Sequence, residues 1–410
     1  MKVSVLTLGC RVNQSESSII KGTLKAGGAT IVNLNENPEF CIINTCSVTA
    51  KSDYNSRQLI RRAARSGAKV IVTGCYSQLK KADVMRMEGV CEVIENNRKL
   101  DAIRIITDRE PAPFFGDYSR SRPYLKVQDG CNYRCSYCTV PLARGKSRSV
   151  PAEEVLRSLR VIVSQGYNEV VLTGIHLGTY GNDLNDGFNL NKLIKHMLKE
   201  TDIKRVRLSS LEITEVDDEL IELLRDDRLC KHLHLPLQSG SQRVLSLMKR
   251  NYEAKFYADR VRSIAALVDN ISLGADIILG FPGESDGDFA DTVALLSDLP
   301  LSYMHIFPFS PRPGTAASQM EGRIDPRTVK RRSAELMELN RLKKRTYMAA
   351  QINRTLEIIV EDAPEGETYI GTSGNYLRIR TTAKGLIKGS IVDVRPVGIV
   401  DDILEGYVVS

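Results

Sequence analysis

The stretch DGCNYRCSYC, residues 129–138, places Cys131, Cys135 and Cys138 at positions i, i+4 and i+7. It directly follows a strand-like run, YLKVQ at residues 124–128, so we expect the cysteines in a loop at the end of a strand. Three thiolates can converge on one cubane 4Fe-4S cluster and leave one of its four irons open, since no fourth Cys or His lies nearby in the sequence. The stretch therefore predicts an open-site iron–sulfur cluster in a fold that alternates strands and helices.

An open iron of this kind can be chelated by the amino and carboxylate groups of S-adenosylmethionine (SAM). One-electron cleavage of SAM gives a 5′-deoxyadenosyl radical. The three-cysteine spacing, with the aromatic Tyr137 directly before the last cysteine, resembles the radical SAM superfamily. The alternative for the same cysteines is a zinc knuckle, which needs a fourth ligand and would have to use a distant residue such as His176.

The resemblance to that superfamily also implies SAM contacts elsewhere in the chain. Tyr137 is one candidate, and Thr173 and Gly174 occupy the place where other members contact the methionine amino group, although the usual acidic residue is missing. Gly280 and Gly283, in the stretch GFPGE, resemble the segment that contacts adenine. A plain loop turn explains GFPGE almost as well.

A second set of cysteines lies nearer the amino terminus. Cys10, Cys46 and Cys75 each follow a strand-like apolar run. Because the carboxyl ends of parallel strands lie along one edge of a sheet, these cysteines can meet there and hold a second open-site cluster. The alternative is that these cysteines are structural. We interpret Cys41, Cys91 and Cys230 as ordinary core or surface residues without a metal-binding role.

The alternation of apolar runs and amphipathic stretches predicts an α/β protein with three parts. Residues 1–112 read as an amino-terminal parallel α/β sandwich, and residues 118–346 as a partial (β/α)6 barrel whose working face lies at the carboxyl ends of its strands. A basic helix at residues 327–350 precedes short strands separated by turn signals, so residues 347–410 read as a small β-barrel. The Pro-Ala-Pro run at residues 111–113 marks a linker.

Composition limits the function classes only loosely. The 410 residues carry a formal net charge of +7, which permits a polyanionic partner without requiring one. The chain starts without a secretory-type segment and contains no apolar run of membrane-spanning length, so we expect a cytoplasmic protein with no membrane partner. In that reducing compartment its nine cysteines are expected to serve metals or catalysis.

Several longer stretches resemble the radical SAM methylthiotransferases: LGCRVNQSES from residue 8, INTCSVT from residue 43, VTGCY from residue 72 and DGCNYRCSYCTVPLARGKSRS from residue 129. The resemblance covers nearly the whole chain and makes the last domain similar to the RNA-binding TRAM domain. It implies two 4Fe-4S clusters, with all six ligands taking part in catalysis. The radical-generating cluster would be held by Cys131, Cys135 and Cys138, and an auxiliary cluster that carries the sulfur by Cys10, Cys46 and Cys75. One SAM would donate the methyl group and another the radical.

The family has three branches, and a few residues distinguish them. Around Cys10, GCRVNQ resembles the branch that acts on N6-threonylcarbamoyladenosine at tRNA position 37, as does GIHLG at residues 174–178. The branches that act on isopentenyladenosine in tRNA or on an aspartate of ribosomal protein S12 typically read GCQMN and GCPKN. A remote alternative is an iron–sulfur RNA-binding regulator without turnover.

The partners implied by the first branch are a tRNA anticodon stem-loop, an electron donor such as flavodoxin or ferredoxin, and a sulfur source. Basic side chains on the last domain and on one amino-terminal helix are candidate RNA contacts, although a solvated surface explains any single one equally well. They are Arg378, Arg380 and Lys388, and Arg57, Arg61, Arg62 and Arg65.

Overall fold

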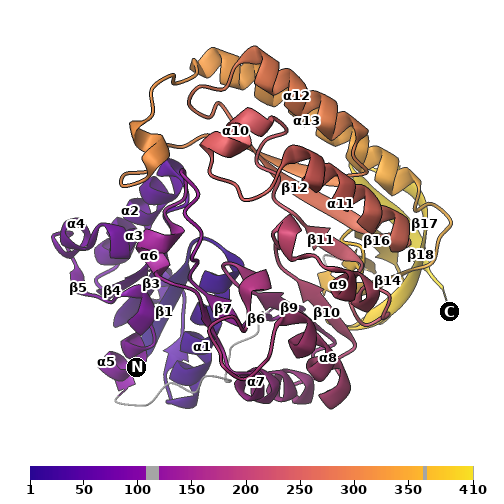
Figure 1. Cartoon of the computed structure of the whole chain (residues 1–410). Coiled ribbons are helices and arrows are strands. Elements are labelled where there is room, and N and C mark those ends of the chain that lie inside the picture. Colours follow the sequence, from indigo (N-terminus) through magenta and orange to yellow (C-terminus); the bar gives the residue numbers. More distant parts are fainter. Residues whose placement is uncertain (108–119, 363–366, 410) are drawn as a thin grey trace.

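The computed structural model describes residues 1–107, 120–362 and 367–409. Figure 1 shows an amino-terminal domain at the left, a curved α/β body through the centre and a small β-barrel at the right edge. The predicted fold class is therefore confirmed. The linker expected at residues 111–113, and with it the limits at residues 112 and 118, lies outside the described residues, so the domain boundaries stay predictions.

The amino-terminal domain is a parallel sheet between two layers of helices. Its strands are β1 (Lys2–Thr7), β2 (Thr30–Ile31), β3 (Phe40–Thr45), β4 (Lys69–Gly74) and β5 (Val90–Val93), in the order β2-β1-β3-β4-β5. Helices α1 (Arg11–Ala26) and α5 (Asp101–Thr107) cover one face, and α2 (Ala50–Arg65), α3 (Cys75–Leu79) and α4 (Lys81–Met85) cover the other. Strands covered on both faces are nearly continuous apolar runs, which is why the FCII portion of β3 predicts a buried strand.

The central body contains six parallel strands in two sheets, in the orders β10-β9-β6 and β11-β12-β13. The strands are β6 (Tyr124–Lys126), β9 (Glu169–Thr173), β10 (Arg205–Leu208), β11 (His232–His234), β12 (Ser272–Leu279) and β13 (Tyr303–Pro308). A hydrogen bond of 2.9 Å from the main-chain N–H of Cys230 to the carbonyl of Val206 links β10 to the segment that enters β11. The six strands therefore form the predicted partial barrel.

Helices surround this barrel and bury its largest apolar core. They are α7 (Ala152–Ser164), α8 (Leu190–Glu200), α9 (Asp218–Leu223), α10 (Gln242–Leu247), α11 (Ala254–Leu267) and α12 (Asp286–Asp298). The cysteine loop lies between β7 (Gln128–Asp129) and α6 (Val140–Arg144), and β8 (Arg148–Ser149) pairs with β7. Short 3-10 helices lie at Leu34–Glu36, Asn96–Arg98, Leu177–Thr179, Ile213–Glu215 and Ala316–Gln319.

The long helix α13 (Pro326–Ala349) runs along the barrel to the carboxyl-terminal domain, as Figure 1 shows. That domain is a closed barrel in the order β14-β15-β16-β18-β17, built from β14 (Leu356–Asp362), β15 (Thr368–Ser373), β16 (Arg378–Thr382), β17 (Ile391–Val400) and β18 (Ile403–Val408). Its core includes Ile358, Ile379 and Leu404, and Met348 of α13 packs against them. Among the described helices, none has the length and apolar character needed to cross a membrane.

Candidate functional site

The central cysteine loop is shaped by a glycine and closed by main-chain hydrogen bonds. Gly130 has φ +72°, and a Cβ atom there would collide with the carbonyl oxygens of Lys146 and Gly145. The N–H of Cys131 donates to the Gly145 carbonyl over 3.1 Å. The loop therefore folds back on the segment that follows α6, with its three cysteines half-buried.

The three thiols of this loop lie near enough to influence one another electrostatically. Burial, opposed by the Val140 N–H and helped by the neighbouring Cys135 and Cys131, raises the pKa of Cys138 to about 12. Each sulfur also accepts one N–H hydrogen bond: from the Tyr133 main chain to Cys131 over 3.4 Å, from Arg250 to Cys135 over 3.3 Å, and from the Val140 main chain to Cys138 over 3.4 Å. Three converging sulfurs with N–H donors fit a cluster held by three thiolates.

Arg250 is a site residue that the sequence did not reveal. Its side chain is buried, pairs with the Glu212 carboxylate, and donates to the Tyr137 hydroxyl over 3.4 Å as well as to Cys135. Tyr137 in turn packs against the apolar cluster that contains Phe281. Nothing in the local sequence marks Arg250, because its partners lie far away along the chain.

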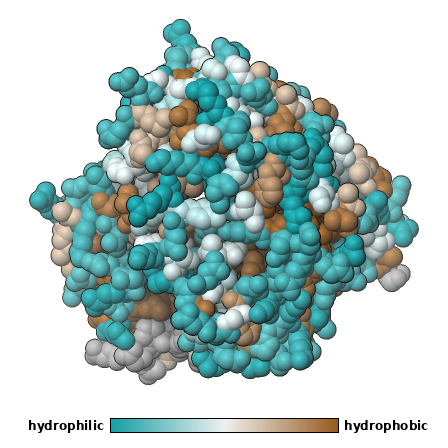
Figure 2. Space-filling model, viewed as in Figure 1, coloured by the Kyte–Doolittle hydropathy of each residue, from teal (hydrophilic) through white to brown (hydrophobic). Residues whose placement is uncertain are grey.

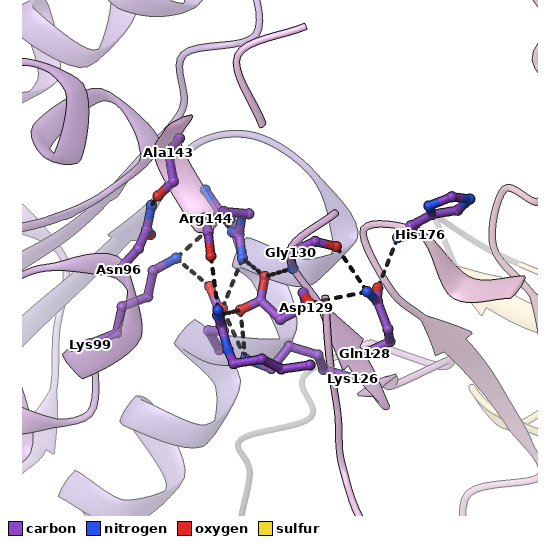
Figure 3. A network of polar contacts seen from close by, with 12 residues as sticks. Asn96, Lys99, Lys126, Gln128, Asp129, Gly130, Ala143, Arg144 and His176 are labelled. Atoms are coloured by element: carbon purple, nitrogen blue, oxygen red, sulfur yellow. Dashed lines mark hydrogen bonds and ion pairs between the residues drawn. The ribbon is translucent and has the colours of Figure 1, made fainter. Parts of the chain in front are cut away.

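His176 lies beside the same cysteines. Its Nδ1 atom is 3.3 Å from Cys131 Sγ and its Nε2 atom is 2.5 Å from Glu215 Oε1. The His176 main-chain N–H donates to Gln128 over 2.8 Å, and Figure 3 shows this contact at the right of the polar network. The structure therefore brings in the distant fourth ligand that the zinc alternative requires, so geometry alone leaves both metals open.

The candidate SAM residues are placed in two regions. Thr173 ends β9 and is buried, and a Cβ atom on Gly174 would lie 2.9 Å from Gln128 Oε1. Gly280 and Gly283 have φ +71° and +80° in the turn after β12. The Gly280 N–H donates to Glu284 over 2.8 Å, which gives this turn a structural role. The SAM contacts therefore stay predictions.

The amino-terminal cysteines meet at one edge of the first sheet, as parallel strands require. Cys10 precedes α1, Cys46 follows β3, and Cys75 begins α3. Burial raises the pKa of Cys46, and the nearby Cys75 and Cys10 thiols raise it further. Three thiols thus form a second group with the chemistry needed to hold a metal cluster.

Two glycines allow this close approach. Gly9 has φ +102°, and a Cβ atom there would lie 2.8 Å from Cys46 Cβ and 2.9 Å from Cys46 Sγ. Gly74 has φ +105°, and its Cβ would collide with the Thr45 main chain. Asn13 ties the loops together, since its side-chain amide donates to the Leu8 and Thr45 carbonyls over 2.7 and 3.0 Å. Larger residues at these glycines would push the cysteine loops apart.

A buried ionic network, drawn in Figure 3, lies between the segments that carry the two cysteine groups. Glu16 of α1 lies at its centre and contacts Lys99 over 2.5 Å, Lys126 over 3.0 Å and Arg144 over 3.2 Å. Arg144 also pairs with Asp129 over 2.7 Å. Burial would raise the pKa of Glu16, but these cations hold it well below its usual range. The network therefore links the helix after Cys10 to the segment after Cys138 through buried ion pairs, in which each charge is stabilised by its partners.

The other end of the barrel also reaches the amino-terminal domain. Arg312, in the loop after β13, donates to the Ser47 hydroxyl over 2.8 Å and pairs with Asp53 of α2. The main-chain N–H of Ala50 donates to Ser310 over 3.1 Å. Figure 2 shows that residues of intermediate hydropathy gather at the centre of a largely hydrophilic face, between the amino-terminal domain and the barrel.

The candidate RNA contacts differ in how free they are. Arg61, Arg62 and Arg65 of α2 are exposed, whereas Arg57 is half-buried and donates to the Tyr76 hydroxyl over 3.5 Å. On the carboxyl-terminal barrel, Arg378 and Lys388 are exposed and Arg380 pairs with Glu405 over 2.7 Å. Of the cysteines interpreted as ordinary core or surface residues, Cys41 and Cys230 are buried and Cys91 is exposed.

Comparison with known proteins supports the iron–sulfur interpretation. Residues 125–296 match the radical SAM superfamily, and residues 2–95 match the uncharacterized protein family UPF0004. A solved structure of the radical S-adenosylmethionine methyltransferase TsrM from Kitasatospora setae shares the fold with a TM-score of 0.60, at 14% identity over 77% of each chain. Fold and cysteine loop together define a radical SAM enzyme, a class that binds a 4Fe-4S cluster and SAM.

Full-length relatives narrow the class further. The chain is 36% identical to the threonylcarbamoyladenosine tRNA methylthiotransferase MtaB of Bacillus subtilis, over 96% of this chain and 93% of the relative. It is 37% identical to the protein of that name from Aquifex aeolicus, over 88% of this chain and 93% of the relative. It is 30% identical to the tRNA-2-methylthio-N(6)-dimethylallyladenosine synthase of Aliarcobacter butzleri, over 100% and 99%. The chain belongs to the radical SAM methylthiotransferase family.

Proposed function

We propose that this enzyme adds a methylthio group to C2 of N6-threonylcarbamoyladenosine at tRNA position 37. The observation that carries the proposal is the similarity to relatives named for threonylcarbamoyladenosine tRNA, which reaches 36 and 37% identity over most of both chains. The relative named for dimethylallyladenosine is less similar, at 30%. The residues around Cys10 favour the same branch.

The two cysteine groups divide the work in this proposal. Cys131, Cys135 and Cys138 hold the cluster that binds SAM, and Cys10, Cys46 and Cys75 hold an auxiliary 4Fe-4S cluster. When bound, the two clusters and SAM supply the 5′-deoxyadenosyl radical, the sulfur and the methyl group, the last from a second SAM. The convergence of each set of thiols supports the assignment.

The polypeptide positions these groups and the substrate. The N–H donors at the central sulfurs, Arg250 among them, favour the thiolate form and tune the cluster potential. Thr173, Gly174, Gly280 and Gly283, with Tyr137, are the proposed SAM contacts. The Glu16 network keeps the two cysteine groups in a fixed relation, so a base held between them can reach both.

The modified base must leave the anticodon-loop stack to reach this site, because a base inside the stack is inaccessible. The proposed partner is therefore the anticodon stem-loop of tRNA, held by the exposed arginines of α2 and by Arg378 and Lys388 of the carboxyl-terminal barrel. Turnover also needs an electron donor such as flavodoxin or ferredoxin, and a sulfur source.

The test is reconstitution under anaerobic conditions, followed by reaction with SAM and a reductant. Three substrates are compared: tRNA carrying threonylcarbamoyladenosine, tRNA carrying isopentenyladenosine, and ribosomal protein S12. Mass spectrometry of the digested products should find the methylthio group only on threonylcarbamoyladenosine. A methylthio group on either of the other two would move the enzyme to that branch, and absence of SAM cleavage would favour the non-catalytic regulator.

A further inference from the structure

All three domains contribute to one contact between Arg11, Tyr376 and His232. Arg11 comes from the amino-terminal domain and is the residue after Cys10, and its Nη2 atom donates to the Tyr376 hydroxyl over 3.3 Å. Tyr376 comes from the turn between β15 and β16. Its ring stacks on His232 of β11 with centroids 4.3 Å apart. A residue next to the auxiliary cysteine group is thus oriented by the carboxyl-terminal barrel.

The position of Tyr376 is firmly determined. Its φ is +67°, which is unfavourable for a bulky residue and persists only where surrounding contacts hold it. Arg207 supplies such contacts by donating to the carbonyls of Gly374 over 3.0 Å and Ser373 over 2.9 Å. The ring also lies 5.9 Å from that of Tyr303. The turn is therefore built to present one hydroxyl to Arg11.

Charge near Arg11 is unbalanced. Within residues 1–107, 120–362 and 367–409, no carboxylate forms an ion pair with Arg11, whereas the nearby Arg207 uses Glu169 over 2.7 Å. Burial and the neighbouring cations, Arg207 first, hold the pKa of His232 well below its usual range, so this ring is neutral. The carboxylate of Asp276 is already engaged by two histidines over 3.1 Å each. Arg11 is therefore a half-buried cation available to an anionic ligand.

We propose that Arg11, oriented by Tyr376, binds the carboxylate of the threonylcarbamoyl group. This inference rests on the proposed function and deepens it by naming a specificity residue. In adenine, the N6 substituent and C2 lie on the same edge of the ring, on either side of N1. A base whose C2 faces the auxiliary cysteines would therefore present its N6 substituent to side chains nearby, and Arg11 directly follows one of these cysteines. An isopentenyl group carries no charge and gains nothing from such a residue.

The experiment measures binding of the reconstituted enzyme to three anticodon stem-loops by fluorescence anisotropy. One carries threonylcarbamoyladenosine, one its neutral primary carboxamide, and one unmodified adenosine. Wild type should bind the acid about 10- to 100-fold more tightly than the carboxamide, the range expected for a desolvated charge-assisted hydrogen bond. In Arg11→Gln the preference should fall to about one while affinity for the carboxamide is kept, and Arg11→Lys should restore part of it.

Tyr376→Phe removes only the orienting hydroxyl, so the preference should fall less than in Arg11→Gln. Arg225→Gln is the matched control, because Arg225 is an exposed arginine that pairs with Glu222 over 2.9 Å. Its preference should equal that of wild type. Iron and sulfide are counted for every variant, and if Arg11→Gln loses iron, Tyr376→Phe decides the test.

Each outcome points one way. Equal binding of acid and carboxamide by wild type, or an unchanged preference in Arg11→Gln, overturns the inference even when threonylcarbamoyladenosine is still methylthiolated. An unchanged preference in Tyr376→Phe overturns the orienting role, and where Arg11→Gln has lost iron it overturns the inference itself. Failure of the proposed function looks different, because wild type would then methylthiolate isopentenyladenosine or S12 and leave threonylcarbamoyladenosine unchanged.

Discussion

Arg207 of the central barrel donates a hydrogen bond of 2.9 Å to the main-chain carbonyl of Ser373 in the carboxyl-terminal barrel. The same guanidinium donates from Nε to Glu169 over 2.7 Å, and both side chains are completely buried. The guanidinium that contacts the carboxyl-terminal barrel is therefore held in place by a buried ion pair within the central barrel. Such a pair is costly to break because the remaining charge stays buried without its partner.

Arg207→Met should lower the free energy of unfolding by about 3 kcal/mol, since it leaves Glu169 with fewer partners and removes the guanidinium donor to the Ser373 and Gly374 carbonyls. Arg380→Met is the matched control. Its partner Glu405 is partly exposed, so the loss should be below about 1 kcal/mol. Urea denaturation of both variants measures the difference. Equal losses would show that Arg207 does not hold the two barrels together.

Acid should weaken the same interface. Burial raises the pKa of Glu169, but Arg207, Arg205 and Arg122 lower it more, to about 2. The pKa of a glutamate in the unfolded chain is about 4.3, so the pKa in the folded protein is the lower of the two. The carboxylate therefore contributes stability that is fully present above the unfolded pKa and is lost as pH falls towards 2.

The stability difference between wild type and Glu169→Gln should accordingly shrink by about 3 kcal/mol between about pH 5 and pH 2. Urea denaturation of both proteins across that range measures it, and comparing the two cancels the titration of other carboxyl groups. A difference that stays constant with pH would mean that Glu169 is not held ionised by its arginines.

Gly9→Ala should disrupt the auxiliary cysteine group selectively. The added methyl would lie 2.9 Å from Cys46 Sγ in a backbone conformation of φ +102°, so Cys46 must move. We expect loss of about half the iron after reconstitution, with SAM cleavage retained. Gly28→Ala is the control, because it also has positive φ but its methyl would meet nothing within 4 Å. Full iron content in Gly9→Ala would contradict the convergence of these cysteines.

Features that depend on local order could be predicted from the sequence. The central cysteines can be recognised by their spacing of i, i+4 and i+7. The amino-terminal cysteines can be grouped because the carboxyl ends of parallel strands share an edge of the sheet. The six-stranded barrel and the closed terminal barrel followed from the spacing of apolar runs.

Long-range polar contacts could not be predicted. Glu16 and Arg144 are 128 residues apart, and Arg11 and Tyr376 are 365 residues apart. No periodicity relates such pairs, since their proximity depends on how whole domains pack. The contact of Arg250 with Cys135 has no signal in the sequence for the same reason, whereas His176 is the distant residue that the zinc alternative names, and it does lie beside Cys131.

The central claim is that two separate three-cysteine groups each hold an iron–sulfur cluster and divide the chemistry. The most direct measurement is iron and sulfide per chain, with SAM cleavage and methylthio product, in anaerobically reconstituted wild type and in the triple variant Cys10→Ala, Cys46→Ala, Cys75→Ala. The account predicts about eight irons in wild type and about four in the variant, which should still cleave SAM but form no methylthio product. A wild type with only about four irons that still cleaves SAM would contradict it, and the amino-terminal cysteines would then be structural.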